Sequence, residues 1–369
     1  MAGRIVVTGS SGMLGGTLAA SLARSGHEVL GVDLRPHPGE EPETPRAEGA
    51  PETPGAEGAS GASGALYATG DVRDTALMTH LVDGADAVVH CAAALPSHAS
   101  AEIHDVIVAG TRGVLTAAHR AGVPRVVHIS STAVYGLPSE VPTTEAHPRR
   151  PVDPYSRAKA AAEEVAEGFR TRGMCVPILR PKTFLGPGRM GLFAMLFEWA
   201  EEGRGFPVLG RGDVRIQMLA VDDLVEAIRR ALRAPADAAG DTFNIAAAEF
   251  GTLREDFQAV LDAAGHGRRV VGLPAGPTLT ALRLLGRTGL SPVYDRLLYK
   301  LLADSYVGID RARDRLGFEP RLSNRDAILR TYEWWRRDRR PERGTPARTG
   351  RTSRDAWRQG ALSLAKVFF

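Results

Sequence analysis

Short apolar runs rich in valine and isoleucine alternate along the chain with longer segments whose apolar residues recur at helical spacing. This alternation is typical of parallel strands that are covered on both faces by crossover helices. It predicts an α/β protein with a doubly wound parallel sheet. The predicted strands are residues 4–8, 28–33, 66–69, 87–91, 125–130, 175–180 and 242–245. The predicted helices are residues 13–25, 75–82, 101–121, 155–172, 192–202, 222–234 and 253–264.

The alternation loosens after residue 181, where glycine and proline interrupt the apolar runs. We therefore expect a main domain over residues 1–181 and a smaller C-terminal lobe that binds substrate, mainly over residues 182–335, with residues 222–246 returning to the sheet. Residues 36–64 hold a near-duplication, ETPRAEGA and then ETPGAEGA, without core-forming side chains. Such composition predicts a disordered insertion. Residues 336–369 are predicted to be a basic, disordered tail.

The composition, with 43% hydrophobic and 24% charged residues, is typical of a soluble globular protein. The formal net charge is +3, but the basic excess is concentrated in residues 336–354, so nucleic-acid binding gains little support. No apolar run approaches the length of a membrane span or a signal peptide, and we expect a cytoplasmic protein without membrane contact. Cys91 and Cys175 lie in strand-like runs and no histidines cluster, so neither a disulfide nor a metal site is predicted.

A glycine-rich segment, TGSSGMLG at residues 8–15, lies where the first strand turns into the first helix. Glycines there allow a tight turn and a close approach of the backbone to a pyrophosphate, which the helix N-terminus attracts. This predicts a Rossmann-type cofactor site. Asp33, at the end of the second strand, can bond the adenosine ribose and repel a 2′-phosphate, which favours NAD. Arg35 can instead neutralise such a phosphate, so NADP stays open. The expected loop contacts are Gly9, Ser11, Gly12, Met13, Leu14 and Gly15.

Tyr155 and Lys159 stand four residues apart at the start of a predicted helix, so both side chains share one face. A tyrosine has a pKa of about 10, and an adjacent ammonium stabilises the tyrosinate enough for proton exchange with a substrate hydroxyl. The predicted strand 125–130 leads into the hydroxyl residues Ser130, Ser131 and Thr132. This is a strand's carboxyl end, where open α/β sheets bind ligands. One hydroxyl there can orient the reacting oxygen toward Tyr155.

Several short motifs together resemble the extended short-chain dehydrogenase/reductase family, which includes NAD-dependent epimerases and dehydratases of nucleotide sugars. The resemblance covers residues 1–330 apart from the insertion. It implies that Ser131 is the catalytic hydroxyl, Tyr155 the acid/base and Lys159 its partner, and that the protein forms a homodimer. It also implies cofactor contacts at Asp71, Val72, Ala92, Ala93 and Pro181. The motifs are TGSSGMLG at 8–15, DV at 71–72, HCAA at 90–93, SSTAVYG at 130–136, YSRAK at 155–159, RP at 180–181, GPG at 186–188 and VDDL at 221–224.

Departures from the family pattern narrow the chemistry. The loop after the catalytic hydroxyl holds Thr132 and Ala133, where dehydratases and decarboxylases of this family carry acids, so elimination and decarboxylation are not expected. Thr183, Ile216 and Ile107 replace an Asn, an Arg and an Asn that are usual in nucleotide-sugar enzymes. The side chains that remain for substrate contact are Thr132, Lys182, Thr183, Arg215 and Gln217. Lys182 is equally consistent with a solvated lysine and Gln217 with a turn cap, and Arg215 is one residue out of register and need not face the site.

Three functions stay open. The first is an NAD-dependent epimerase or related oxidoreductase that acts on a nucleotide sugar through the Ser-Tyr-Lys set. The second is an NAD(P)H-dependent reductase or dehydrogenase of a non-nucleotide alcohol or ketone, such as a secondary metabolite. The third is a non-catalytic protein that senses a dinucleotide. In the first two the expected partner is a small-molecule substrate, not a nucleic acid.

Overall fold

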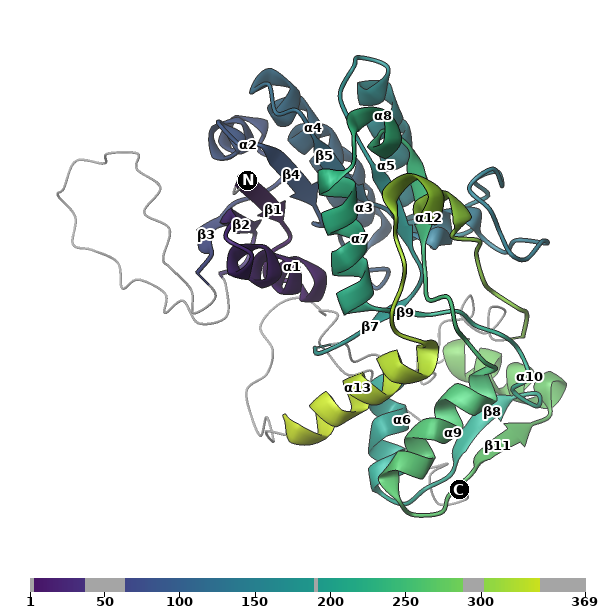
Figure 1. The fold of residues 1–369 in the computed structure, drawn as a ribbon. Coiled ribbons are helices and arrows are strands. Elements are labelled where there is room, and N and C mark those ends of the chain that lie inside the picture. The colour runs from purple at the N-terminus through teal and green to yellow at the C-terminus, as the bar shows by residue number, and fades with distance from the viewer. Residues whose placement is uncertain (1–2, 37–63, 189–191, 288–301, 339–369) are drawn as a thin grey trace, which may run out of the picture. The chain divides into compact units, whose positions relative to one another are not determined.

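The computed structural model describes residues 3–36, 64–188, 192–287 and 302–338 (Figure 1). The predicted insertion, apart from its two end residues, and residues 339–369 of the predicted tail lie outside the described residues.

A seven-stranded sheet forms the centre of the N-terminal part of the chain, in the order β10-β6-β5-β4-β1-β2-β3. Val6 pairs in parallel with Leu30 on one side and with Val88 on the other, and every strand pair whose register is resolved in this sheet is parallel. The strand order reverses at β1 and β4, so the sheet is doubly wound as predicted. The strands are β1 (Arg4–Thr8), β2 (Glu28–Asp33), β3 (Leu66–Thr69), β4 (Ala87–His90), β5 (Val126–Ile129), β6 (Ile178–Pro181) and β10 (Thr242–Ile245).

Helices cover both faces of this sheet (Figure 1). The buried side chains of β1, β2 and β4 pack with those of α2 and α4 in one apolar cluster that includes Val32, Met78 and Val114. On the other face Arg229 of α7 bonds the hydroxyls of Ser21 and Ser25 at the end of α1. The helices are α1 (Met13–Arg24), α2 (Thr75–Val82), α3 (Ser100–His104), α4 (Gly110–Arg120), α5 (Pro154–Arg170), α7 (Val221–Arg233) and α8 (Ala236–Ala239).

The long helix predicted over residues 101–121 is interrupted. Between α3 and α4 lies one π-helical turn, η1 (Asp105–Ala109), in which the N–H of Gly110 reaches the carbonyl of Asp105, five residues back. The hydroxyl of Thr111 donates to the carbonyl of Ile107 at 2.6 Å. A hydroxyl that competes for a helical carbonyl loosens the regular ladder, which sequence periodicity does not reveal.

The chain separates into two compact units. The first holds Met1–Val134, Pro151–Arg180 and Ala227–Phe243, and the second holds Tyr135–Arg150, Pro181–Glu226 and the described residues from Asn244 on. One division falls between Arg180 and Pro181. Tyr135–Arg150 differs from our expectation: Tyr135 donates its hydroxyl to Asn244 at 2.7 Å, and the N–H of Thr143 bonds the carbonyl of Tyr306. Those partners lie far along the sequence, so local pattern did not predict them.

The second unit packs three helices around an aromatic core that includes Trp199, Phe257 and Tyr332. Its last helix, α13 (Asn324–Arg337), begins at a capping box of Ser323 and Asp326 and buries Trp335. The predicted tail therefore starts too early, because Arg336 and Arg337 complete this helix. The remaining elements are η2 (Thr132–Tyr135), β7 (Phe184–Leu185), α6 (Leu192–Glu201), β8 (Phe206–Leu209), β9 (Leu219–Ala220), α9 (Leu253–Ala264), β11 (Val270–Leu273), α10 (Ala275–Arg287) and α12 (Asp310–Leu316).

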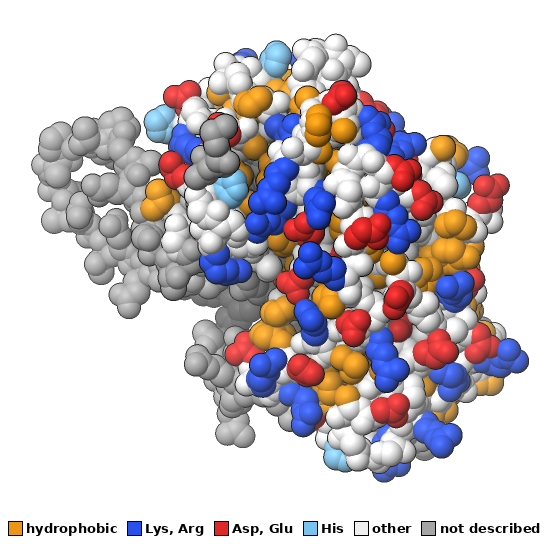
Figure 2. All heavy atoms as spheres, viewed as in Figure 1, with side chains coloured by type: hydrophobic (Ala, Val, Ile, Leu, Met, Phe, Trp, Pro, Cys, Tyr) orange, Lys and Arg blue, Asp and Glu red, His pale blue; other side chains and the backbone are white. Residues whose placement is uncertain are grey.

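Acidic and basic side chains alternate over the visible face of the molecule (Figure 2). Where residues are described, no helix is long and apolar enough to cross a membrane.

Candidate active site

The glycine-rich loop connects β1 to α1 and can hold only glycine at two positions. Gly9 has a φ of +75°, and a Cβ there would lie 2.7 Å from the backbone nitrogen of Ala92. A Cβ at Gly15 would lie 2.2 Å from the carbonyl oxygen of Gly9. Gly12 is the N-cap of α1 and contributes no capping side chain. The helix therefore opens with backbone N–H groups at a narrow loop, and this arrangement fits the pyrophosphate of a dinucleotide.

Asp33 orders this loop as well as ending β2. Its carboxylate accepts hydrogen bonds from the N–H groups of Ser11 and Arg35, each at 3.0 Å. The guanidinium of Arg35 lies 3.8 Å from the same carboxylate and is half exposed. A carboxylate in this position beside the loop can accept hydrogen bonds from ribose hydroxyls and would repel a 2′-phosphate.

The other predicted cofactor contacts also lie in the first unit, except Pro181, which is the buried last residue of β6. The Asp71 carboxylate accepts hydrogen bonds from Nε and Nη2 of Arg73 at 3.0 and 2.5 Å, and these bonds hold the pKa of Asp71 below its usual value. Val72 is buried, and its carbonyl oxygen would lie 2.6 Å from a Cβ at Gly113. Ala92 approaches the hydroxyl of Thr8 through its N–H at 3.4 Å, and Ala93 is exposed.

The three predicted catalytic residues come from two elements of the first unit. Ser131 is the second residue after β5, and its Oγ accepts the N–H of Ala133 at 3.2 Å as the chain enters η2. Tyr155 is the second residue of α5, and Lys159 follows one turn later on the same helix. The Nζ of Lys159 donates to the carbonyl oxygen of Ile129 at 2.8 Å. Lys159 thus ties the helix that bears Tyr155 to the strand that leads into Ser131.

The position of α5 is set by its sequence. Asp153 caps the helix through the N–H of Ser156 at 2.7 Å, and the Ser156 hydroxyl reaches back to the N–H of Asp153 at 3.0 Å. Pro154 occupies the first helical position, where a missing N–H is harmless. The helix therefore begins one residue before Tyr155, which fixes the phenol in its first turn.

Lys159 is a buried charge, with a side chain only 4% exposed. Burial lowers its pKa from 10.5 to about 8, while Cys91 and Glu163 act in the opposite direction. Burial and, by a smaller amount, the charge of Lys159 lower the pKa of His90 to about 3. Near neutral pH Lys159 is therefore mostly cationic, whereas His90 is neutral.

The side chains predicted to contact substrate in the second unit have structural partners. The Nζ of Lys182 donates to the carbonyl and the hydroxyl oxygen of Ser305 at 2.9 and 2.8 Å. Gln217, 2% exposed, donates to the carbonyl of Ala247 and accepts the N–H of Val307. Sequence patterns gave no indication of these long-range bonds.

Arg215, Thr183 and Thr132 are more accessible. The guanidinium of Arg215 lies 4.7 Å from the ring centroid of Phe250 and 5.2 Å from that of Tyr306, and Arg215 is exposed. Thr183 is exposed and Thr132, in the first unit, is half-buried. Phe250 and Tyr306 were missed as neighbours of Arg215 because they come from distant segments.

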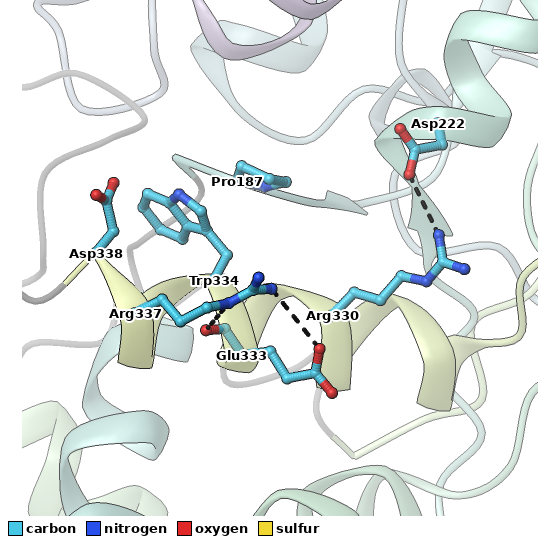
Figure 3. Close-up of a pocket in the computed structure, with 7 residues that line it drawn as sticks. All are labelled: Pro187, Asp222, Arg330, Glu333, Trp334, Arg337 and Asp338. Atoms are coloured by element: carbon cyan, nitrogen blue, oxygen red, sulfur yellow. Dashed lines mark hydrogen bonds and ion pairs between the residues drawn. The ribbon is translucent and has the colours of Figure 1, made fainter.

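A surface cavity of about 500 Å³ in the second unit contains none of the predicted site residues (Figure 3). Its charged groups largely pair with one another: Arg330 lies 3.7 Å from Asp222, and Arg337 lies 3.9 Å from Glu333. We assign no chemistry to it. The lining residues are Pro187, Asp222, Arg330, Glu333, Trp334, Arg337 and Asp338. Within the described ranges, no group of three or more His, Cys, Asp or Glu residues is placed to hold a metal ion.

Comparison with known proteins decides the family. A model of the NAD dependent epimerase/dehydratase family matches residues 5–246. The chain belongs to this family. The resemblance inferred from the motifs is thereby confirmed, and NAD is the cofactor that the family uses.

Relatives of the chain differ in their substrates. The uncharacterized protein y4nG of Sinorhizobium fredii is 35% identical over 349 residues, which cover 91% of this chain and 81% of that protein. A 3 beta-hydroxysteroid dehydrogenase/Delta 5-->4-isomerase of Mycobacterium tuberculosis is 29% identical, covering 90% of each chain. A UDP-glucose 4-epimerase of Mycolicibacterium smegmatis is also 29% identical, covering 90% of this chain and 98% of that one.

The fold matches solved structures. The UDP-glucose 4-epimerase of Thermotoga maritima superposes with a TM-score of 0.69 at 23% identity and covers 90% of this chain and 99% of that chain.

Proposed function

We propose that this protein is an NAD-dependent enzyme that transfers hydride at a carbinol or ketone carbon of a nucleotide sugar, as an epimerase or a related oxidoreductase. One observation carries the proposal. The ammonium of Lys159 is bound to the strand end that leads into Ser131, one helical turn after Tyr155, in the unit that holds the glycine-rich loop.

This arrangement supports acid–base catalysis by Tyr155. A neighbouring cation favours the tyrosinate, so Tyr155 can take the proton of a substrate hydroxyl and return it to a carbonyl oxygen. Ser131 can donate a hydrogen bond to the same oxygen and hold it toward the phenol. Bound NAD would accept hydride from the carbinol carbon and give it back. Thr132 and Ala133 supply no acid for elimination, so we propose no dehydratase activity.

A second candidate is an oxidoreductase of a non-nucleotide alcohol or ketone. Lys182 and Gln217, two of the side chains that remained for substrate contact, bond the segment around Ser305 and Val307. A steroid dehydrogenase is also among the relatives. Both observations favour a less polar substrate, and neither changes the proposed roles of Ser131, Tyr155 and Lys159. We also expect a homodimer and a cytoplasmic location, as the resemblance and the sequence imply.

The test is a turnover screen of UDP-glucose and dTDP-glucose against steroid and alkyl ketones, each with NAD(H) and NADP(H). An epimerase converts the sugar without a net change in absorbance of the reduced nicotinamide, and a ketone reductase consumes reduced cofactor stoichiometrically. Tyr155→Phe should lower turnover at least about 100-fold and spare NAD binding. Tyr67→Phe, a tyrosine of β3 in the same unit, is the control and should stay active. Wild-type turnover in Tyr155→Phe would overturn the proposed mechanism, and NAD binding without turnover of any substrate would favour the sensor.

A further inference from the structure

Beneath α5 lies a buried group of charged and polar side chains with no role in the proposed reaction. The carboxylate of Glu163 accepts hydrogen bonds from Nε and Nη2 of Arg180 at 2.9 and 2.6 Å. It also accepts the hydroxyl of Ser130 at 2.5 Å. Glu163 is 0% exposed, and Arg180 and Ser130 are each at most 4% exposed. Three elements of the first unit, α5, β6 and the end of β5, therefore meet at one carboxylate.

This group adjoins the catalytic residues along the chain on both elements. Glu163 follows Lys159 by one helical turn, and Ser130 immediately precedes Ser131. Lys159 bonds the carbonyl of Ile129 and Glu163 accepts the hydroxyl of Ser130, so successive turns of α5 bind the last residue of β5 and the residue that follows it. A buried ion pair contributes little to stability compared with apolar packing of the same volume. Its place beside the site suggests a reason other than stability.

We propose that Glu163 is a positioning residue: through Ser130 and Arg180 it fixes the end of β5, and with it Ser131, against the helical turn that carries Lys159. This inference rests on the proposed function for its effect on turnover. Its electrostatic part, in which the charge of Glu163 favours the charged form of Lys159, does not.

Charge supports the same assignment. The groups that act electrostatically on Lys159, or that it acts on, are Glu163 of α5, Cys91 after β4, His90 of β4 and His128 of β5. Burial lowers the pKa of Lys159, and Cys91 and, by a smaller amount, Glu163 raise it. Loss of the Glu163 charge would remove this effect and leave the cation of Arg180 without its partner. Both changes disfavour a charged Lys159.

The lysine content of the chain makes a direct test possible. Only Lys159, Lys182, Lys300 and Lys366 occur in the sequence, so lysine labelled with ¹³C at Cε gives four NMR signals. A Lys159→Arg variant assigns the signal of interest. In Glu163→Gln we expect the titration midpoint of Lys159 to fall by about one pH unit or more. Glu163→Asp keeps the charge and should restore most of the midpoint.

Arg170→Met is the matched control. Arg170 lies at the other end of α5 and donates to the carbonyls of Val176 and Asp241 at 2.6 and 2.5 Å. Its loss should lower thermal stability without lowering the Lys159 midpoint, because it removes a cation of the same region and not an anion. An unchanged midpoint in folded Glu163→Gln would overturn the proposal, and so would an equal shift in Arg170→Met.

Ser130→Ala keeps every charge and tests the positioning of Ser131 should Glu163→Gln fail to fold. We expect kcat to fall about tenfold with unchanged NAD affinity and an unchanged Lys159 midpoint. Wild-type kcat in Ser130→Ala would refute the positioning of Ser131. The NMR titration needs no turnover. A shifted midpoint in a protein without turnover therefore refutes the proposed function and leaves the electrostatic effect of Glu163 on Lys159 established.

Discussion

Two buried polar groups of the first unit, His128 and Lys159, are less well compensated than three buried amides of the second unit. In the second unit Gln217, Asn244 and Asn324 are buried, and each uses its amide nitrogen and its amide oxygen in hydrogen bonds. In the first unit His128 is 1% exposed, and neither of its ring nitrogens has a hydrogen-bond partner among the described residues. Lys159 is buried with a pKa well below that of a free lysine.

This difference indicates where the chain favours function over stability. Buried polar groups that are fully bonded make a structure specific, whereas a buried charge that is only partly compensated lowers stability. Natural proteins accept such a loss at functional sites. We therefore expect substitutions of the poorly compensated groups to stabilise the fold and abolish activity. Substitutions of the well-bonded groups should destabilise the fold and spare the functional site.

Lys159→Met gives the largest expected effect. Turnover should fall at least about 100-fold. Because the folded-state pKa of about 8 lies below the ordinary value of 10.5, the charged form is penalised in the folded protein at every pH below about 8. The penalty declines as the pH rises from about 8 to 10.5. Above that range the lysine is neutral in both states. Urea denaturation at pH 7 should show the variant to be more stable by about 2 kcal/mol, with a smaller gain at pH 10.

Lys182→Met is the control for that gain. Lys182 is also buried, but its ammonium bonds two oxygens of Ser305. Removing it should destabilise the protein at both pH values. A stabilised Lys182→Met, or a destabilised Lys159→Met at pH 7, would remove the distinction between the units.

Asn244→Ala tests the well-bonded side of the comparison. Asn244 is 0% exposed, accepts the hydroxyl of Tyr135, and donates to the carbonyls of Thr143 and Gly308. The variant removes these three hydrogen bonds between buried groups, and we expect a loss of about 3 kcal/mol in the free energy of unfolding. Denaturant titration measures it. NAD binding should be retained under native conditions, and a stability equal to wild type would contradict the structural role.

The first unit was more predictable from the sequence than the second, for a physical reason. Buried parallel strands and their crossover helices repeat a simple apolar pattern, so β1, β2, β3 and β10 have the bounds that periodicity predicted. Elements such as β7 and β9 are two residues long, and α13 is strongly charged on its exposed face. Neither a short strand nor a charged helix stands out from the surrounding loops by pattern alone.

The site was predictable to the extent that local spacing determines it. The spacing of Tyr155 and Lys159 on one helix and the turn at Gly9 follow from neighbouring residues, and the structure places them in one unit. The bonds from Lys182 to Ser305 and from Arg180 to Glu163 join different elements of the fold. Local spacing indicates only that Glu163 lies one helical turn after Lys159. Only the fold reveals such pairs.

Asp33→Asn addresses the cofactor end of the first unit with a smaller effect. The variant removes the negative charge beside the loop and keeps the size of the side chain. We expect NAD affinity to fall about tenfold and NADP affinity to rise, because repulsion of the 2′-phosphate is lost. Calorimetry with both dinucleotides measures the ratio. Asp71→Asn, in which the partner of Arg73 is altered instead, should change both affinities in the same direction and leave the ratio in place.

The smallest effect is expected at Asp256, which qualifies the comparison because it is a buried carboxyl in the second unit. Asp256 is 3% exposed and accepts the amide of Asn324 at 2.8 Å. Burial raises its pKa from 3.8 to about 6. The folded state thus holds a proton that the unfolded state has released between these values, so this group makes the protein less stable as the pH rises from 3.8 to about 6.

Asp256→Asn removes this dependence and keeps an oxygen that can accept the Asn324 amide. At pH 7.5 we expect the variant to be more stable than wild type by about 1 kcal/mol, because it buries no charge. At pH 4.5 the two should differ little, since the wild-type carboxyl is then mostly protonated. Urea denaturation at the two pH values measures this. An equal gain in the free energy of unfolding at the two pH values would show that packing, and not the buried charge, causes the gain. Of the groups compared, only Lys159 and His128 would then count as poorly compensated.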